Sequence, residues 1–249
     1  MGNITFLDSA MGSELISRGK RLPPHIWSAH ANLHNPEDVY QIHLNNIEAG
    51  AQMITANTFR ATPRAYAKTG LSKMAAENKA KTSFLSAMHT AHKAANANII
   101  VLGSIAPLED CYMPELFPGE NIAINEFLQL GNWLMEGGAD GIIIETMNNI
   151  SETRAALDAL LPLNLPIYTS FYLADPEHLG SGERLIDALF FIEDYPIEAV
   201  LLNCSPIDIM LASIDNLINI WHGMWGILPN LGIGTPSYDG TIKEIFSDE

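Results

Sequence analysis

The sequence is short of cysteine, of basic residues and of long apolar runs. Its two cysteines, Cys111 and Cys204, cannot build the disulfide framework that small secreted domains use. Lysine and arginine number 13 against 29 aspartate and glutamate, so the formal net charge is −16. This balance predicts no binding to nucleic acid or to an anionic membrane surface, because both need cationic patches. No apolar run reaches about 18 residues, so no transmembrane helix is expected.

Signals for targeting or for common cofactors are also missing. The first residues contain no basic segment followed by an apolar one, as a signal peptide would, and they do not fit the myristoylation pattern. A cytoplasmic protein is therefore expected. The chain contains no Gly-x-Gly-x-x-Gly or P-loop segment, so neither a dinucleotide nor ATP is indicated as a ligand.

Short apolar runs alternate with helical stretches along the whole chain. The runs predicted as strands are residues 4–8, 52–57, 98–105, 141–145, 166–173, 200–204 and 224–229. The predicted helices are residues 36–50, 73–95, 126–137, 151–161, 182–194 and 206–222, with a short helical turn at 14–18 and an irregular, proline-containing segment at 20–36. Such alternation implies βαβ units and a parallel sheet. A length of 249 residues suits one TIM-type (β/α)8 barrel, which needs about 250.

A complete barrel of this type has eight strands, and only about seven βα units can be counted. Residues 1–249 are therefore predicted to form a single barrel domain that is incomplete at its carboxyl end. Either the chain is a truncated form or the barrel is open between its first and seventh strands. An open barrel would leave two unpaired strand edges that favour association, so a homo-oligomer is one expectation.

Polar residues stand where the predicted strands end. In a barrel of parallel strands these ends share the face that carries the active site. The residues are Asp8, Asn57, Thr58, Ser104, Glu145, Thr146, Ser170, Tyr172, Asn203, Cys204 and Asn230.

Three of these residues have competing interpretations. Asp8 could bind an ammonium group or could make an Asx-turn or helix cap. Glu145 follows three isoleucines, so its carboxylate needs a partner, either a substrate group or a neighbouring Lys or Arg. Cys204 could be a nucleophile, a metal ligand or a small buried hydrophobic residue.

The histidines do not indicate a site. His89 and His92 are expected on a solvated helix face, and no histidine is recognisably placed as a base for a cysteine nucleophile.

Several segments, in this order and spacing, resemble the homocysteine S-methyltransferase family across essentially the whole chain. They are FLDSAMGSELISRG (6–19), EAGAQMITANTFRA (48–61), GSIAP (103–107), GGADGIIIETM (137–147), LNCSP (202–206) and the Asn at 230 with the Gly at 232. The resemblance implies a (β/α)8 barrel that transfers a methyl group to the sulfur of homocysteine, giving methionine. It also implies zinc held by three thiolates, which binds the substrate sulfur at its open position.

The resemblance assigns a role to individual residues. Cys204 matches a zinc ligand, and Asp8 and Glu145 match the acidic residues that hold the amino group of homocysteine. Ala10, Met11 and Gly12 match the turn near its carboxylate, and Asn57, Thr58 and Ser104 match the side that faces the methyl donor. No residue is assigned as a catalytic acid or base.

The chain departs from the family pattern in one important respect. It lacks the Gly-Gly-Cys-Cys segment that supplies the other two thiolates, and its only other thiol belongs to Cys111. Two functions are therefore carried forward. The first is a homocysteine methyltransferase that uses a small donor, with S-methylmethionine favoured because nothing resembles a folate or cobalamin domain. The alternative is an inactive amino-acid-binding or interaction barrel that has lost zinc.

Overall fold

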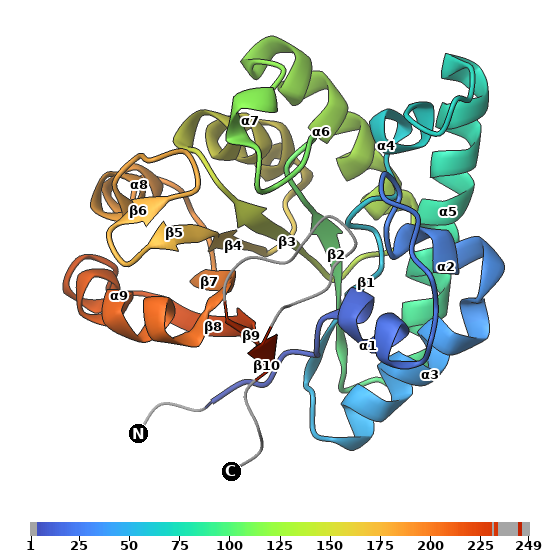
Figure 1. The fold of residues 1–249 in the computed structure, drawn as a ribbon, viewed down its shortest axis with the longest axis horizontal. Coiled ribbons are helices and arrows are strands. Elements are labelled where there is room, and N and C mark those ends of the chain that lie inside the picture. The colour runs from blue at the N-terminus through green and yellow to red at the C-terminus, as the bar shows by residue number, and fades with distance from the viewer. Residues whose placement is uncertain (1–3, 231, 234–243, 246–249) are drawn as a thin grey trace. The chain divides into compact units, whose positions relative to one another are not determined.

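The computed structural model describes residues 4–230, 232–233 and 244–245 (Figure 1). Its internal contacts divide the chain into two compact units. Unit 1 comprises Met1–Ile105 and Gln129–Ile142, and unit 2 comprises Ala106–Leu128 and Ile143–Glu249. Helix α6 (Glu120–Glu136) and strand β3 (Gly141–Met147) contribute residues to both units.

Unit 1 is built on strands β1 (Met53–Ala56) and β2 (Ile100–Ile105), which pair in parallel, and on the first residues of β3. Its helices are α1 (Met11–Ser17), α2 (Ala29–His34), α3 (Pro36–Glu48), α4 (Pro63–Ala67), α5 (Lys73–Ala94) and the second half of α6. Helix α5 packs against α2, α3 and α4 (Figure 1, blue to teal). A buried apolar cluster of Leu15, Ala31, Val39 and Ile42 joins α1, α2 and α3.

Local sequence accounts for the long helices of unit 1. Pro36 is the first residue of α3, where it needs no N–H partner, and two acidic residues follow it in the first turn, where the helix dipole favours them. Ser72 caps α5 by accepting a hydrogen bond from the Ala75 N–H at 3.4 Å. Gly103 on β2 permits close packing of α6, because a Cβ there would clash with Cδ2 of Leu134.

Two sequence predictions for unit 1 are wrong in detail. Residues 4–8 form no strand. Leu7 makes a single parallel bridge to Met53. The next hydrogen bond, from the Thr55 N–H, is accepted by the Asp8 side chain and not by a backbone carbonyl. The segment 20–36 contains helix α2, whose buried face packs on α3 and α5. Asn35 stands at the start of α3 but makes no side-chain cap hydrogen bond.

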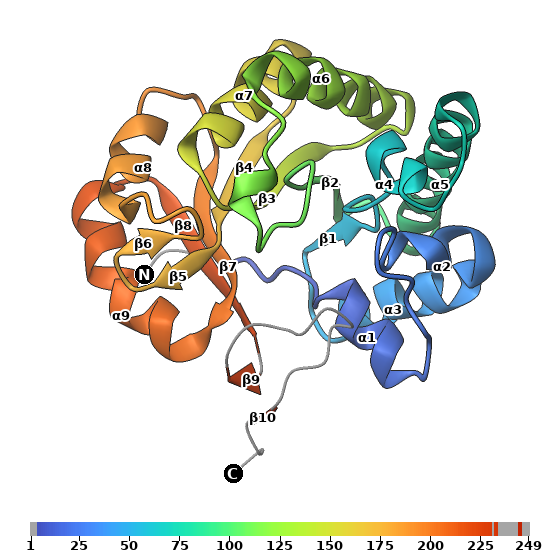
Figure 2. The same ribbon diagram turned by 45° about the horizontal axis from the view of Figure 1, so that its top comes forward.

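Unit 2 contains the rest of β3 and strands β4 (Ile167–Phe171), β7 (Ala199–Pro206) and β8 (Met224–Asn230), in the order β3-β4-β7-β8. β7 runs parallel to both neighbours, with Tyr168 opposite Ala199 and Ala199 opposite Met224. Helix α9 (Ile207–Ile220) packs on β7 and β8 with α8 (Leu185–Ile192) beside it (Figure 2). The remaining elements are α7 (Ile150–Leu160), the 3-10 turns η1 (Pro114–Leu116) and η2 (Leu161–Leu163), and the short strands β5 (Leu173–Asp175), β6 (His178–Leu179), β9 (Gly232–Ile233) and β10 (Glu244–Ile245).

The predicted fold class is confirmed. Parallel strands alternate with helices in both units, as in a TIM-type α/β barrel, and β7 is buried along nearly its whole length, as its apolar run predicts. The described residues contain six such strands rather than seven, because the first predicted strand is reduced to one bridge. None of the helices in the described part of the chain is long and apolar enough to cross a membrane.

Candidate functional site

The predicted site residues fall into two sets, one in each unit. Asp8, Ala10, Met11, Gly12, Asn57, Thr58 and Ser104 belong to unit 1, and Glu145 and Cys204 belong to unit 2.

In unit 1, Asn57 follows β1 and is tied into a buried amide pair. Its Nδ2 donates to the Ser28 carbonyl at 2.8 Å and to Oδ1 of Asn32 at 2.7 Å. Asn32 returns a hydrogen bond to the Asn57 carbonyl at 2.9 Å and donates to Oγ of Ser83 at 3.1 Å. Asn57 is only 4% exposed. These contacts join the end of β1 to α2 and α5, so in this structure Asn57 has a framework role.

Thr58 and Ser104 stand together at the ends of β1 and β2. The Thr58 hydroxyl donates to the Ser104 carbonyl at 2.7 Å and accepts from the Ser104 N–H at 2.9 Å. Both residues are almost fully buried. One hydroxyl thus pairs with two backbone groups at the point where the backbone hydrogen bonding between β1 and β2 ends.

Asp8 is also buried, beside a histidine that the sequence does not single out. Its Oδ2 accepts the Thr55 N–H at 2.8 Å, a contact with β1 that is distant in sequence. Nδ1 of His43 lies 3.9 Å from the same oxygen. His43 is fully buried, and its two ring nitrogens have no hydrogen-bond partner among the described residues. Burial lowers the pKa of His43 to about 4, so the ring is neutral at pH 7.

Ala10, Met11 and Gly12 form the start of α1 rather than a free turn. Ala10 is the residue before the helix, and Met11 and Gly12 are its first two residues. A Cβ at Gly12 would lie 2.5 Å from Nε1 of Trp27, so packing alone requires a glycine there.

In unit 2, the side chain of Asn203 connects the ends of β3, β4 and β7. Its Oδ1 accepts the Thr146 N–H at 3.0 Å and the Ser170 hydroxyl at 2.7 Å. Its Nδ2 donates to Oγ1 of Thr146 at 2.8 Å and, over longer distances of 3.4 Å, to Oε2 of Glu145 and Sγ of Cys204. Asn203 thus contacts both of the residues predicted for this unit.

The backbone is unusual at the same place. Thr146 and Cys204 have φ angles of 60° and 57°, in the left-handed region. That conformation is rare for residues other than glycine, and especially for a β-branched residue such as threonine. Each residue in such a conformation costs about 1–3 kcal/mol and needs compensating contacts. On the neighbouring strand, Nδ2 of Asn230 donates to the Cys204 carbonyl at 2.8 Å.

The Cys204 thiol is protonated at neutral pH. Burial, with the nearby Cys111 and Glu145, raises its pKa to about 12, against a smaller opposite effect of the Thr146 hydroxyl, whose oxygen is 3.7 Å from the sulfur. A reactive cysteine nucleophile needs a lowered thiol pKa. The structure therefore argues against Cys204 as a nucleophile acting alone.

Two tyrosines lie close to the cysteines. The rings of Tyr112 and Tyr172 pack edge to face, with centroids 5.0 Å apart and an interplanar angle of 90°. Burial raises the pKa of both phenols, and negative charge on Cys111 or Cys204 would raise it further. Both rings are therefore neutral and apolar neighbours of the thiols.

The described residues do not fit a three-thiolate zinc site. Within residues 4–230 and the two short strands that follow, no three His, Cys, Asp or Glu side chains come together in a way that could hold a metal ion. The chain has two cysteines, so a third thiolate is absent from its sequence. Cys204 is the one thiol that the family resemblance assigns as a ligand.

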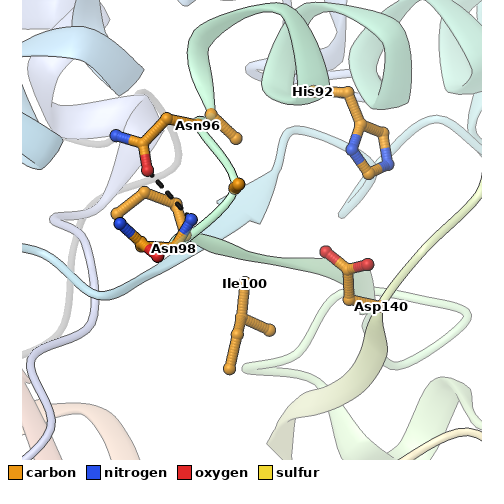
Figure 3. Close-up of a pocket in the computed structure, with 8 residues that line it drawn as sticks. His92, Asn96, Asn98, Ile100 and Asp140 are labelled. Atoms are coloured by element: carbon orange, nitrogen blue, oxygen red, sulfur yellow. Dashed lines mark hydrogen bonds between the residues drawn. The ribbon is translucent and has the colours of Figure 1, made fainter.

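A separate pocket of unit 1 lies away from these residues. It has a volume of about 430 Å³ and is lined by His92, residues 95–100 and Asp140 (Figure 3). It lies at the amino end of β2, whereas Thr58 and Ser104 mark the carboxyl ends of β1 and β2. Active sites in TIM-type barrels lie at the carboxyl ends of the strands. His89 is exposed as predicted, but His92 is half-buried and its Nε2 has no partner within the described structure, so the solvated face predicted for it is wrong.

The structure thus brings together Thr58 with Ser104 in unit 1 and Glu145 with Cys204, through Asn203, in unit 2. Sequence reasoning missed His43 and Tyr112. No local signal marks His43, which lies in an ordinary helix, and Tyr112 lies in a loop whose neighbours across the fold cannot be read from the sequence.

Comparisons with known proteins agree with one another. The family model described as "Homocysteine S-methyltransferase" matches residues 5–248. The Homocysteine S-methyltransferase of Escherichia coli is 29% identical over 97% of this chain and 81% of its own length. Homocysteine S-methyltransferase 3 of Zea mays is 27% identical over 98% of this chain and 77% of its own length.

Solved structures give the same result. The metallated form of the E. coli homocysteine methyltransferase MmuM superposes with a TM-score of 0.83 at 29% identity, covering 93% of this chain and 85% of that one. Its apo form gives a TM-score of 0.74 at 27% identity, covering 93% and 83%. Since the family match extends over nearly the whole sequence, this chain belongs to the homocysteine S-methyltransferase family of enzymes.

Proposed function

We propose that this protein transfers a methyl group from a small donor to the sulfur of homocysteine, giving methionine. The observation that carries the proposal is the family match over residues 5–248, which also supports the prediction that residues 1–249 are one family domain. The E. coli and maize relatives are named as homocysteine S-methyltransferases.

Two carboxylates are proposed to hold the amino group of homocysteine. They are Asp8 in unit 1 and Glu145 in unit 2. Asp8 is 9% exposed and Glu145 is half-buried, so a bound ammonium group would be attracted more strongly than in water. Ala10, Met11 and Gly12 are proposed to lie near the substrate carboxylate, and Asn57, Thr58 and Ser104 to form the framework of the donor side.

The methyl donor is proposed to be small and positively charged, with S-methylmethionine favoured. The neutral Tyr112–Tyr172 pair and the carboxylate of Glu145, both close to Cys204, are an environment that attracts a sulfonium cation. In the reaction, a lone pair on the homocysteine sulfur forms the new S–CH₃ bond. The old C–S bond breaks and returns its electron pair to the donor sulfur, which becomes a neutral thioether. The homocysteine thiol proton leaves to solvent.

Zinc remains a prediction of the family resemblance, with Cys204 as its candidate ligand. The family and the metallated relative support it, but the described donor set does not fit. No step of the proposed reaction is therefore assigned to zinc.

The lack of a three-thiolate donor set among the described residues favours a second candidate function, an inactive amino-acid-binding barrel. It would keep Asp8 and Glu145 and bind homocysteine without turning it over.

One experiment separates the two functions. The purified chain is incubated with homocysteine and, in turn, CD₃-labelled S-methylmethionine, betaine and methyl-folate, and labelled methionine is measured by mass spectrometry. Homocysteine binding is measured in parallel by calorimetry, and zinc by elemental analysis. Labelled methionine from any donor supports the enzyme. Binding without turnover supports the inactive barrel, and neither binding nor turnover contradicts both.

Two further expectations concern the location of the protein in the cell and its oligomeric state. The protein is predicted to be cytoplasmic and to act on homocysteine and a small donor rather than on nucleic acid or membranes. Association into a homo-oligomer is expected from unpaired strand edges, and size-exclusion chromatography with light scattering tests it.

A further inference from the structure

The Asn203 carboxamide is fixed at both of its ends. Its oxygen faces two donors, the Thr146 N–H and the Ser170 hydroxyl, and its nitrogen faces the Thr146 hydroxyl at 2.8 Å. The backbone N–H can only donate, so the orientation of the amide follows from its neighbours. Asn203 is 3% exposed. It therefore presents its second N–H to Glu145 and Cys204 in a set direction.

A purely structural role would not explain where this network lies. Thr146 directly follows Glu145, and Cys204 directly follows Asn203, and both Thr146 and Cys204 have left-handed backbones. Asn203 supplies two of the hydrogen bonds that Thr146 makes in this conformation. Backbone strain of this kind is retained where the surrounding structure over-determines it, which is common at binding and catalytic sites.

We propose that Asn203 is a positioning residue that holds the Glu145 carboxylate and the Cys204 sulfur in one arrangement. This inference rests on the proposed function, in which Glu145 binds the amino group of homocysteine. Asn203 itself need not touch the substrate. Its effect on binding passes through Glu145 and through the Thr146 backbone that carries Glu145.

These contacts predict how removal of the Asn203 side chain changes the affinity for homocysteine. Without the Asn203 side chain, Glu145 loses one of its donors and Thr146 loses two hydrogen bonds, so the carboxylate is held less firmly. Hydrogen bonds to a charged group are strong enough that their loss changes an equilibrium constant about tenfold. We expect Asn203→Ala to raise the dissociation constant of homocysteine by about that factor.

A matched control separates positioning from loss of stability. Ser213 is fully buried in α9 and donates to the Met210 carbonyl at 2.8 Å. Ser213→Ala also removes a buried hydrogen bond, but it touches neither Glu145 nor Cys204. It should lower the melting temperature while leaving the homocysteine dissociation constant within about twofold.

Asn203→Asp supplies a second variant of the same shape, for use if Asn203→Ala does not fold. It keeps both acceptor contacts, removes the donors and places a carboxylate beside Glu145. It should weaken homocysteine binding at least as much as Asn203→Ala.

The deciding experiment is a double-mutant cycle on homocysteine binding, measured by calorimetry on the full 249-residue chain with Glu145→Gln, Asn203→Ala and the double variant. If Asn203 acts through Glu145, Asn203→Ala weakens binding about tenfold in the parent chain and less than about twofold in the Glu145→Gln chain. Equal effects in both chains, or no effect in the parent, overturn the inference. If Glu145→Gln leaves affinity unchanged, the proposed role of Glu145 fails, and the inference with it.

Discussion

The strand ends of the two units differ in what their polar residues do. In unit 1, Asn57 is hydrogen-bonded to Asn32 and to a backbone carbonyl, and Thr58 to the backbone of Ser104, and none of the three has a left-handed backbone. In unit 2, Glu145 and Cys204 are joined by an amide, two backbones are left-handed, and a thiol is kept protonated.

The difference indicates separate tasks. Satisfied hydrogen bonds in relaxed geometry stabilise a fold, whereas strain and altered pKa values cluster at functional sites. We therefore expect substitutions at Asn57, Thr58 and Ser104 to act mainly on stability, and those at Glu145, Asn203 and Cys204 mainly on binding and chemistry. Three predictions test this contrast, in decreasing order of expected size.

Asn57→Ala should lower the free energy of unfolding by about 3 kcal/mol, because it removes two buried hydrogen bonds and leaves Oδ1 of Asn32 and the Ser28 carbonyl without their donor. Urea denaturation measures the change. Asn125→Ala is the control, since Asn125 is exposed on α6 and should change stability by less than about 0.5 kcal/mol. A variant that is stable but no longer binds homocysteine would contradict the framework role.

Cys204 should react at pH 8 at least about a hundredfold more slowly with iodoacetamide than a free cysteine, because its raised pKa leaves little thiolate. The measurement uses mass spectrometry on the Cys111→Ser chain, with the same chain in urea as the reference. The rate should keep rising with pH beyond pH 9. A plateau below pH 9 would mean that the thiol is not shielded, and the contrast between the units would weaken.

His43 should make stability depend on pH. Its folded pKa of about 4 lies below the ordinary value of 6.5, so the unfolded chain binds more protons between these values, and stability falls as the pH is lowered. The contribution lost between pH 7.5 and pH 5 is about 2 kcal/mol. We expect the His43→Gln chain to lack this part of the pH dependence. Denaturation curves of the parent and variant chains at both pH values give the free energies of unfolding that test this prediction. An equal loss of stability between pH 7.5 and pH 5 in the two chains would contradict it.

Much of the fold could be predicted because its signals are local. The six strands and the helices 36–48, 73–94, 150–160 and 207–220 follow from apolar runs, prolines and capping residues, and their predicted positions agree with the structure to within a few residues. The errors arise where distant contacts decide. Helix α2 is stabilised by packing on α3 and α5, and residues 4–8 pair at one position because the Asp8 side chain takes the next hydrogen bond.

The candidate site was predictable in part. Glu145, Asn203 and Cys204 were candidates because they stand at the ends of predicted strands. The family resemblance predicted roles for Glu145 and Cys204. That Asn203 connects Thr146, Ser170 and Cys204 could not be foreseen, because these hydrogen bonds join residues up to 57 positions apart.

The sequence by itself determined the α/β class, the family and the scarcity of thiols, because composition, periodicity and motif order are properties of the chain. Only the tertiary structure decided that Asn57 has a framework role, that His43 is buried beside Asp8 and that the Cys204 thiol stays protonated. Hydrogen bonding across strands and removal from water depend on which residues become neighbours, and that is settled only when the chain folds.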